Sequence, residues 1–181
     1  TDRVWRAVRL SIAWQRFLML GVIIPFFNRI DALRETLRAL AQQTLPAEQF
    51  KVLVVDDGSH ETLLDVVTGW SVPHNLCCLE QEHKGPAAAR NRGAMEIDAD
   101  LYVFLDADMI PVPDLLQQYV AAHAANPRSI ICGRQLPWSP AYQDWLHQVF
   151  PMVYDLGPKP IFVEAYQLAS GNMAVPRPVL Q

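Results

Sequence analysis

The chain has 181 residues, of which 51% are hydrophobic and 19% are charged, and its formal net charge is −4. A single domain of this size hides roughly 70% of the surface of its unfolded chain, so a packed core is expected. The acidic balance argues against nucleic-acid binding, which needs a broad basic face. The three cysteines, with Cys77 and Cys78 adjacent, indicate neither a disulfide framework nor a spaced metal site. They favour a reducing compartment, and we predict a cytoplasmic protein.

Residues 1–19 are expected to form an N-terminal leader, helical in conformation. Arginines alternate there with apolar side chains that include Trp5 and Trp14. Such a basic amphipathic helix could contact the inner face of a membrane, or pack on the domain or in a homo-oligomer, and packing is the favoured interpretation. The longest apolar stretch, residues 17–27, has about half of the roughly 20 residues that cross a bilayer and predicts a core strand instead.

From residue 20 to residue 181 we expect one α/β domain, because short apolar runs alternate with segments of helical period. This alternation is typical of a mostly parallel sheet flanked by helices. Helices are predicted to begin near Asp31 and Ser59, which we expect as caps, and near Ala87 and Pro113. Between residues 137 and 160 the prolines predict a long excursion over the sheet. The predicted strands cover residues 21–25, 51–55, 75–79, 101–105 and 129–133.

Two of the predicted strands end in paired acids. Asp56 and Asp57 follow one strand, and Asp106 and Asp108 follow another as a DXD motif. Because parallel strands open on the same edge of a sheet, both pairs are expected to meet where α/β folds bind ligands. Carboxylate oxygens suit a hard divalent cation, so a metal holding an anionic ligand is predicted there. A second copy of the motif, residues 98–100, precedes its strand and is interpreted as a turn.

Five motifs in order carry a resemblance to a known family. They are Val22–Arg29, Val54–Ser59, Gly85–Gly93, Phe104–Asp108 and Gly171–Ala174. Over about residues 20 to 178 the chain resembles family two of the nucleotide-sugar glycosyltransferases, which have the GT-A fold. The three spaced glycines of dinucleotide oxidoreductases and the Walker phosphate loop are absent.

The resemblance implies a nucleotide site at the ends of the first two strands. Phe27 stands where the family usually has Tyr, so stacking is kept and a hydroxyl contact is lost. Asp57 would accept a hydrogen bond from the base, usually uracil, and Asp56 would support the turn or the ribose. The residues implied to border the nucleobase are Pro25, Phe27, Asn28 and Arg29.

For the phosphates and the sugar the resemblance implies a second group of residues. Lys84 and Arg90 would lie near the nucleotide and diphosphate, with pairing to a nearby acid as the alternative for Arg90. Asp106 would approach the ribose or a metal-bound water, and Asp108 would ligate Mn²⁺ or Mg²⁺, between which the sequence does not choose. The implied neighbours of the donor sugar and acceptor are Gly171 and Asn172.

The reaction implied is metal-dependent, inverting transfer from a nucleotide-diphospho-sugar, most simply a UDP-sugar, to an unknown hydroxyl acceptor. A carboxylate would act as general base. We expect that base beyond Gln181, rather than at Asp144 or Glu164, which makes the chain a C-terminally truncated domain with little activity by itself. The alternative is a catalytically silent nucleotide-sugar-binding or assembly module. A nucleotidyltransferase is disfavoured, because no glycine-rich basic phosphate loop opens the chain.

Overall fold

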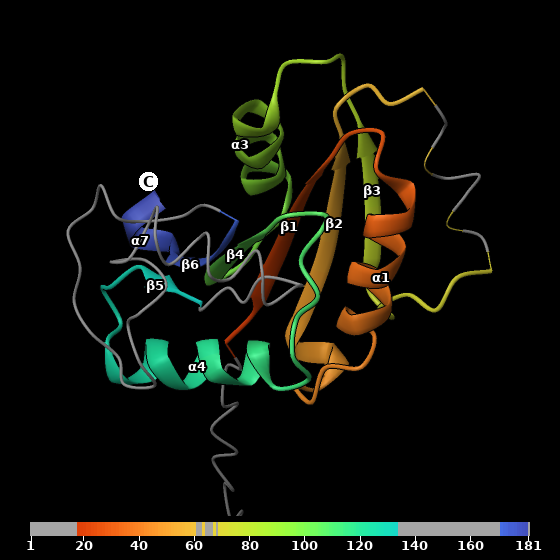
Figure 1. The fold of residues 1–181 in the computed structure, drawn as a ribbon. Helices are drawn as coiled ribbons and strands as arrows, with labels where there is room; N and C mark the ends of the chain where they lie inside the picture. Colours follow the sequence, from red (N-terminus) through yellow and green to blue (C-terminus); the bar gives the residue numbers. More distant parts are fainter. Residues whose placement is uncertain (1–17, 61–62, 64–66, 68, 134–170, 181) are drawn as a thin grey trace, which may run out of the picture.

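The computed structural model describes residues 18–60, 63, 67, 69–133 and 171–180, and within them six strands form one sheet in the order β3-β2-β1-β4-β6-β5. β1 to β4 run parallel, whereas β6 is antiparallel to both β4 and β5. The predicted mostly parallel α/β sheet is thus confirmed (Figure 1). The strands are β1 Leu20–Phe26, β2 Phe50–Asp56, β3 Leu76–Glu80, β4 Leu101–Leu105, β5 Ile131–Cys132 and β6 Asn172–Pro176.

Helices cover both faces of this sheet. One core layer joins α1 and α4 to β1, β2 and β4, and it includes Leu37 and Leu116. The other layer joins α3 to the opposite face, where Ala89 packs near Ile23. Burial on both faces explains why the central strands are continuous apolar runs. The helical segments are α1 Ile30–Leu40, the 3₁₀ turn η1 Ala47–Gln49, α3 Pro86–Glu96, α4 Leu115–Ala125 and α7 Arg177–Leu180.

Gly93 allows α3 to lie close to the sheet. A Cβ atom at this position would stand 2.5 Å from the Cγ2 atom of Ile23 and 3.3 Å from a methyl group of Val55. Both neighbours are fully buried strand residues, so they have little room to move aside. This close approach places the N-terminal half of α3 next to the ends of β1 and β2.

Helix starts differ from the expectation at two points. Arg29 is the N-cap of α1, and no side chain caps that end. Asp31 instead lies inside the first turn, where its negative charge interacts favourably with the positive end of the helix dipole. Pro113 lies before α4 and not at its first position, because Asp114 is the N-cap. The Pro113 carbonyl accepts a hydrogen bond from the Thr44 N–H. The start of the helix expected after Ser59 falls on residues outside the described ones, and the Ser59 hydroxyl accepts a hydrogen bond from the Asn28 N–H.

Residues 1–17 of the predicted leader and the predicted excursion at 137–160 lie outside the described residues, as do Asp144 and Glu164. In the part of the chain that the structure describes, every helix is too short or too polar to cross a bilayer.

Candidate functional site

The carboxyl ends of β1, β2 and β4 lie side by side at one edge of the sheet, since β1 pairs in parallel with both neighbours. A hollow of about 390 Å³ opens at this edge. Seven of the predicted site residues line it together. They are Pro25, Phe27, Arg29, Asp57, Arg90, Asp106 and Asp108. The hollow is also lined by Phe26, His83, Pro86 and Ala107.

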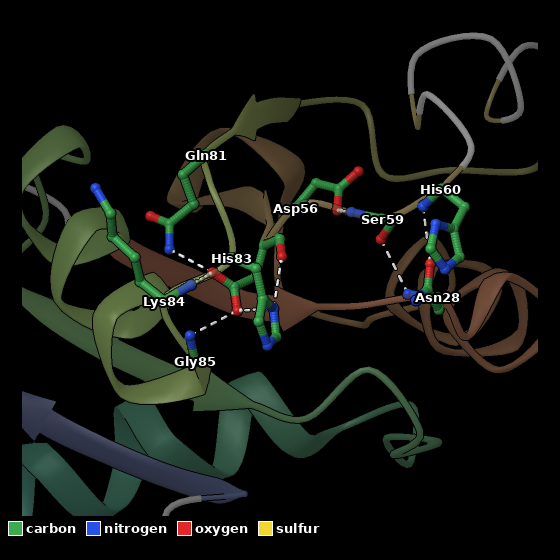
Figure 2. Close-up of polar contacts among 9 residues, drawn as sticks. Asn28, Asp56, Ser59, His60, Gln81, His83, Lys84 and Gly85 are labelled. Carbon is green, nitrogen blue, oxygen red and sulfur yellow. Dashed lines mark hydrogen bonds and ion pairs between the residues drawn. The ribbon is translucent and has the colours of Figure 1, made fainter.

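Asp57 is held by the loop that follows β3. Its Oδ1 accepts hydrogen bonds from the Gln81 side-chain amide at 2.7 Å and from the Lys84 N–H at 2.8 Å, and its Oδ2 accepts one from the Gly85 N–H at 2.8 Å (Figure 2). The Nδ1 atom of His83 lies 3.0 Å from Oδ2. Burial alone would raise the pKa of Asp57, but these hydrogen bonds outweigh it and lower the pKa below its ordinary value. Asp57 is therefore an ionised anchor for residues 81–85.

Asp56 supports the neighbouring turn, as one of the two sequence expectations had it. Its Oδ1 accepts a hydrogen bond from the Ser59 N–H at 2.9 Å. The Ser59 hydroxyl accepts one from the Asn28 N–H, and the Asn28 side-chain oxygen accepts one from the His60 N–H, both at 2.9 Å (Figure 2). Asn28 has φ of +56°, a conformation that Asn tolerates better than most residues. The turn between β1 and α1 is thus fixed to the loop after β2.

Two rings form one wall of the hollow. The Phe27 and His83 ring centroids are 4.4 Å apart with an interplanar angle of 33°, and Phe27 is 41% exposed. His83 was not among the predicted site residues, since a loop histidine is usually solvated. Its position two residues before the Gly85–Gly93 motif was the feature of the sequence that could have indicated a place in the site. The Lys84 side chain instead pairs with Glu82 at 3.8 Å and does not line the hollow.

The two acids of the DXD motif are each paired with an arginine. Arg90 Nη2 lies 2.5 Å from Asp106 Oδ1, and Arg29 Nη1 lies 2.5 Å from Asp108 Oδ2. The Nε atom of Arg90 is buried and has no hydrogen-bond partner within the described residues. Two guanidinium groups thus neutralise the two carboxylates.

This donor set fits a divalent cation that takes most of its ligands from substrate. The described residues contain no group of three or more His, Cys, Asp or Glu side chains that could hold a metal. Asp106 and Asp108 nevertheless line the same hollow, and Mg²⁺ in particular is often held by one or two carboxylates together with phosphates and water.

The backbone of the DXD turn is anchored from two sides. The Asp106 N–H donates to the Gly171 carbonyl at 2.9 Å, just before β6. The buried Thr36 of α1 donates its hydroxyl to the Ala107 carbonyl at 2.8 Å. These hydrogen bonds fix the backbone from which the side chains of Asp106 and Asp108 extend.

The buried side chain of Asn172 is held by a hydrogen bond from α4. Its side-chain oxygen accepts a hydrogen bond from the Tyr119 hydroxyl at 2.6 Å, and burial raises the pKa of Tyr119, so that the hydroxyl stays protonated. A Cβ atom on Gly133 would stand 2.6 Å from the same hydroxyl. Neither Gly171 nor Asn172 lines the hollow, and the support from Tyr119 had no signal in the sequence.

Several proteins named as glycosyltransferases are similar to this chain. Validoxylamine A glucosyltransferase of Streptomyces hygroscopicus subsp. jinggangensis is 40% identical over 118 residues, which are 64% of this chain and 28% of that protein. Glycosyltransferase AglE of Haloferax volcanii is 31% identical over 62% of this chain and 38% of that protein. The chain therefore spans well under half the length of these relatives.

Solved structures agree with this similarity. S. aureus TarS 1-349 in complex with UDP matches with a TM-score of 0.58 and 27% identity, over 67% of this chain and 39% of that one. The mannosyltransferase PcManGT from Pyrobaculum calidifontis, in complex with GDP-Man and Mn²⁺, matches with a TM-score of 0.60 and 26% identity, over 67% and 37%. The sequence model of glycosyl transferase family 2 matches residues 21–177. The chain therefore belongs to glycosyl transferase family 2, with the GT-A fold that the motifs implied.

Proposed function

We propose that this chain is the donor-binding domain of a metal-dependent, inverting glycosyltransferase that uses a nucleotide-diphospho-sugar, with a UDP-sugar preferred. The observation that carries this proposal is the hollow itself, which has the ring wall of Phe27 and His83 and also the carboxylates of Asp106 and Asp108. A nucleobase needs a flat apolar surface, and a cation-neutralised diphosphate needs oxygen ligands.

At the base end, Phe27 and Pro25 supply the apolar surface and Asp57 supplies an acceptor. We assign Oδ2 of Asp57 to the base, because its side-chain partner is the exposed His83, whereas the side-chain partner of Oδ1 is the part-buried Gln81. His83 is 60% exposed and can move away, whereas the backbone N–H groups of Lys84 and Gly85 are fixed. The preference for uracil rests on the family pattern and on a similar structure that holds UDP.

At the phosphate end, Asp108 and Asp106 are the residues that would hold the cation. A divalent cation bound there supplies Lewis-acid stabilisation of the negative charge that grows on the β-phosphate. Mn²⁺ in PcManGT supports this assignment. Arg90, fixed by α3, faces the same end, and we assign Lys84 to the outer part of the nucleotide.

At the sugar end, we propose that Gly171 acts through its carbonyl, which holds Asp106, and that Asn172 lies near the donor sugar and acceptor. The general base, the acceptor hydroxyl and contact of the leader with a membrane or a second copy stay predictions.

A second candidate is a catalytically silent nucleotide-sugar-binding or assembly module. Within the described residues, every acid that lines the hollow is already paired or hydrogen-bonded, since Asp57 holds the loop and Asp106 and Asp108 hold arginines. None is therefore available to deprotonate an acceptor. Hydrolysis of a UDP-sugar by this chain, lost in Asp108→Asn, would exclude the silent module.

The test is a thermal-shift series with UDP, GDP, CDP and ADP, each with Mn²⁺ and with a chelator. We expect UDP to raise the melting temperature, with a further rise in Mn²⁺ that Asp108→Asn abolishes. Asp98→Asn is the control, because this exposed acid has the same motif spelling at the opposite edge of the sheet. A wild-type melting curve that no nucleotide changes would rule out the proposal.

A further inference from the structure

Arg29 occupies one of the two carboxylates that a cation would need. Its Nη1 lies 2.5 Å from Asp108 Oδ2, although the two residues are 79 positions apart in the sequence. A guanidinium and a divalent cation cannot both take this oxygen, because their charges repel and their positions overlap. A cation that takes Oδ2 of Asp108 would therefore displace Arg29, and one bound through Oδ1 alone would still meet the positive charge of Arg29 close by.

Arg29 is free to leave in a way that Arg90 is not. The Arg90 side chain is 16% exposed and extends from the middle of α3, whereas the Arg29 side chain is 65% exposed and its partner Asp108 is 40% exposed. Exposed ion pairs of this kind are weak, because water and salt screen them. Of the two pairs, the one on Asp108 is the one that a ligand can open.

The backbone at Arg29 stays in place while its side chain moves. Asn28, immediately before it, is bonded to Ser59 and to the His60 N–H. Arg29 also lines a second hollow, of about 630 Å³, at the start of α1. Arg29 thus lines two hollows and its side chain is 65% exposed, so it has room to rotate away from Asp108.

We propose that Arg29 competes with the cation for Asp108. A nucleotide diphosphate draws Arg29 away from Asp108 by offering the guanidinium its own phosphate oxygens. The planar guanidinium matches a diphosphate with two parallel hydrogen bonds, so Arg29 moves from carboxylate to phosphate as the cation takes Asp108. Cation and nucleotide then bind as a coupled pair, and each raises the affinity for the other by the same factor. This inference rests on the proposed function and adds how binding of the nucleotide and binding of the cation are coupled.

The experiment uses Arg29→Gln in the full chain, with two binding measurements of opposite expected sign. Mn²⁺ alone, titrated by the electron paramagnetic resonance of the free ion, should bind about two- to fivefold more tightly, because no ion pair has to open. UDP alone, titrated by calorimetry in a chelator, should bind about three- to tenfold more weakly, because a charged phosphate contact is lost. The factor by which UDP raises Mn²⁺ affinity should fall.

Arg38→Gln is the matched control. It removes the same charge from an exposed ion pair of α1, with Glu35 at 3.8 Å, and should change neither affinity. Arg29→Lys keeps the charge without the planar fork, and its UDP affinity should fall between those of the wild type and Arg29→Gln.

Unchanged Mn²⁺ affinity in Arg29→Gln, in a wild type that binds UDP with Mn²⁺, would overturn this inference and leave the proposed function standing. Equal losses of both affinities would also overturn it, because they would indicate a purely structural role. A wild type that binds neither Mn²⁺ nor UDP would remove the proposed function together with it.

Discussion

Asp57 and Asp108 follow strands that end at the same edge of the sheet, and both line the same hollow. Asp57 is 3% exposed, and its two oxygens are surrounded by one loop of its own chain. The Asp108 side chain is 40% exposed, with Arg29 as its ion-pair partner. The comparison teaches that position at a strand end does not decide what a carboxylate does. An acid with several fixed partners holds the fold while it faces the hollow, whereas an acid with one exposed partner is the easier one for a cation to open.

The largest effect should come from replacing Asp57 by its amide, with the same change at Asp108 as the comparison. Asp57→Asn puts an NH₂ group against backbone N–H donors and should lower the free energy of unfolding by about 2 to 4 kcal/mol. Asp108→Asn removes one exposed ion pair and should cost no more than about 1 kcal/mol. Urea denaturation of both variants measures the two values. Equal losses would contradict the distinction between the two acids.

The stability that Asp57 contributes should depend on pH in one direction. Because its pKa is lowered in the folded chain, the contribution is complete above the unfolded pKa of about 4 and is lost as pH falls through the folded pKa. The difference in unfolding free energy between wild type and Asp57→Asn should therefore be constant from about pH 7 to 5 and shrink below about pH 4. Urea denaturation across this range measures it, and a difference that grew in acid would count against the ionised anchor.

Much of this fold was predictable, because buried parallel strands are apolar runs and the two acid pairs follow such runs directly. The difference between Asp57, with several fixed partners, and Asp108, with one exposed partner, could not be predicted. Two of the partners of Asp57 are the backbone N–H groups of Lys84 and Gly85, 27 and 28 residues away, and backbone groups leave no trace in the side-chain pattern. The partner of Asp108 is Arg29, 79 residues away, and only the meeting of β1 and β4 brings them together.

A smaller effect should follow from removing the hydrogen bond between Thr36 and the turn that carries Asp108. Thr36→Val keeps the shape of the side chain but leaves the Ala107 carbonyl without its hydroxyl donor, and should cost about 1 to 2 kcal/mol of unfolding free energy. Thr36→Ser keeps the hydroxyl and is the control. Mn²⁺ affinity in the presence of UDP should fall in the first variant and be retained better in the second. The same affinity in both would show that the turn needs no anchor from α1.

The smallest effect is expected at the ring wall. Phe27→Ala removes a partly exposed stacking surface and should weaken UDP binding by about 1 kcal/mol, or about fivefold. Phe27→Tyr restores the residue usual in the family and should bind UDP at least as well as the wild type. Calorimetric titration measures both. Unchanged binding in Phe27→Ala would place the base elsewhere in the hollow.

The central claim is that this edge of the sheet binds a nucleotide diphosphate together with a divalent cation. Calorimetric titration of UDP into the full chain, once in Mn²⁺ and once in a chelator, tests it most directly. We expect UDP to bind in both buffers and more tightly in Mn²⁺, and we expect Asp108→Asn to lose the gain. Equal affinity in the two buffers, or no heat of binding in either, would contradict it.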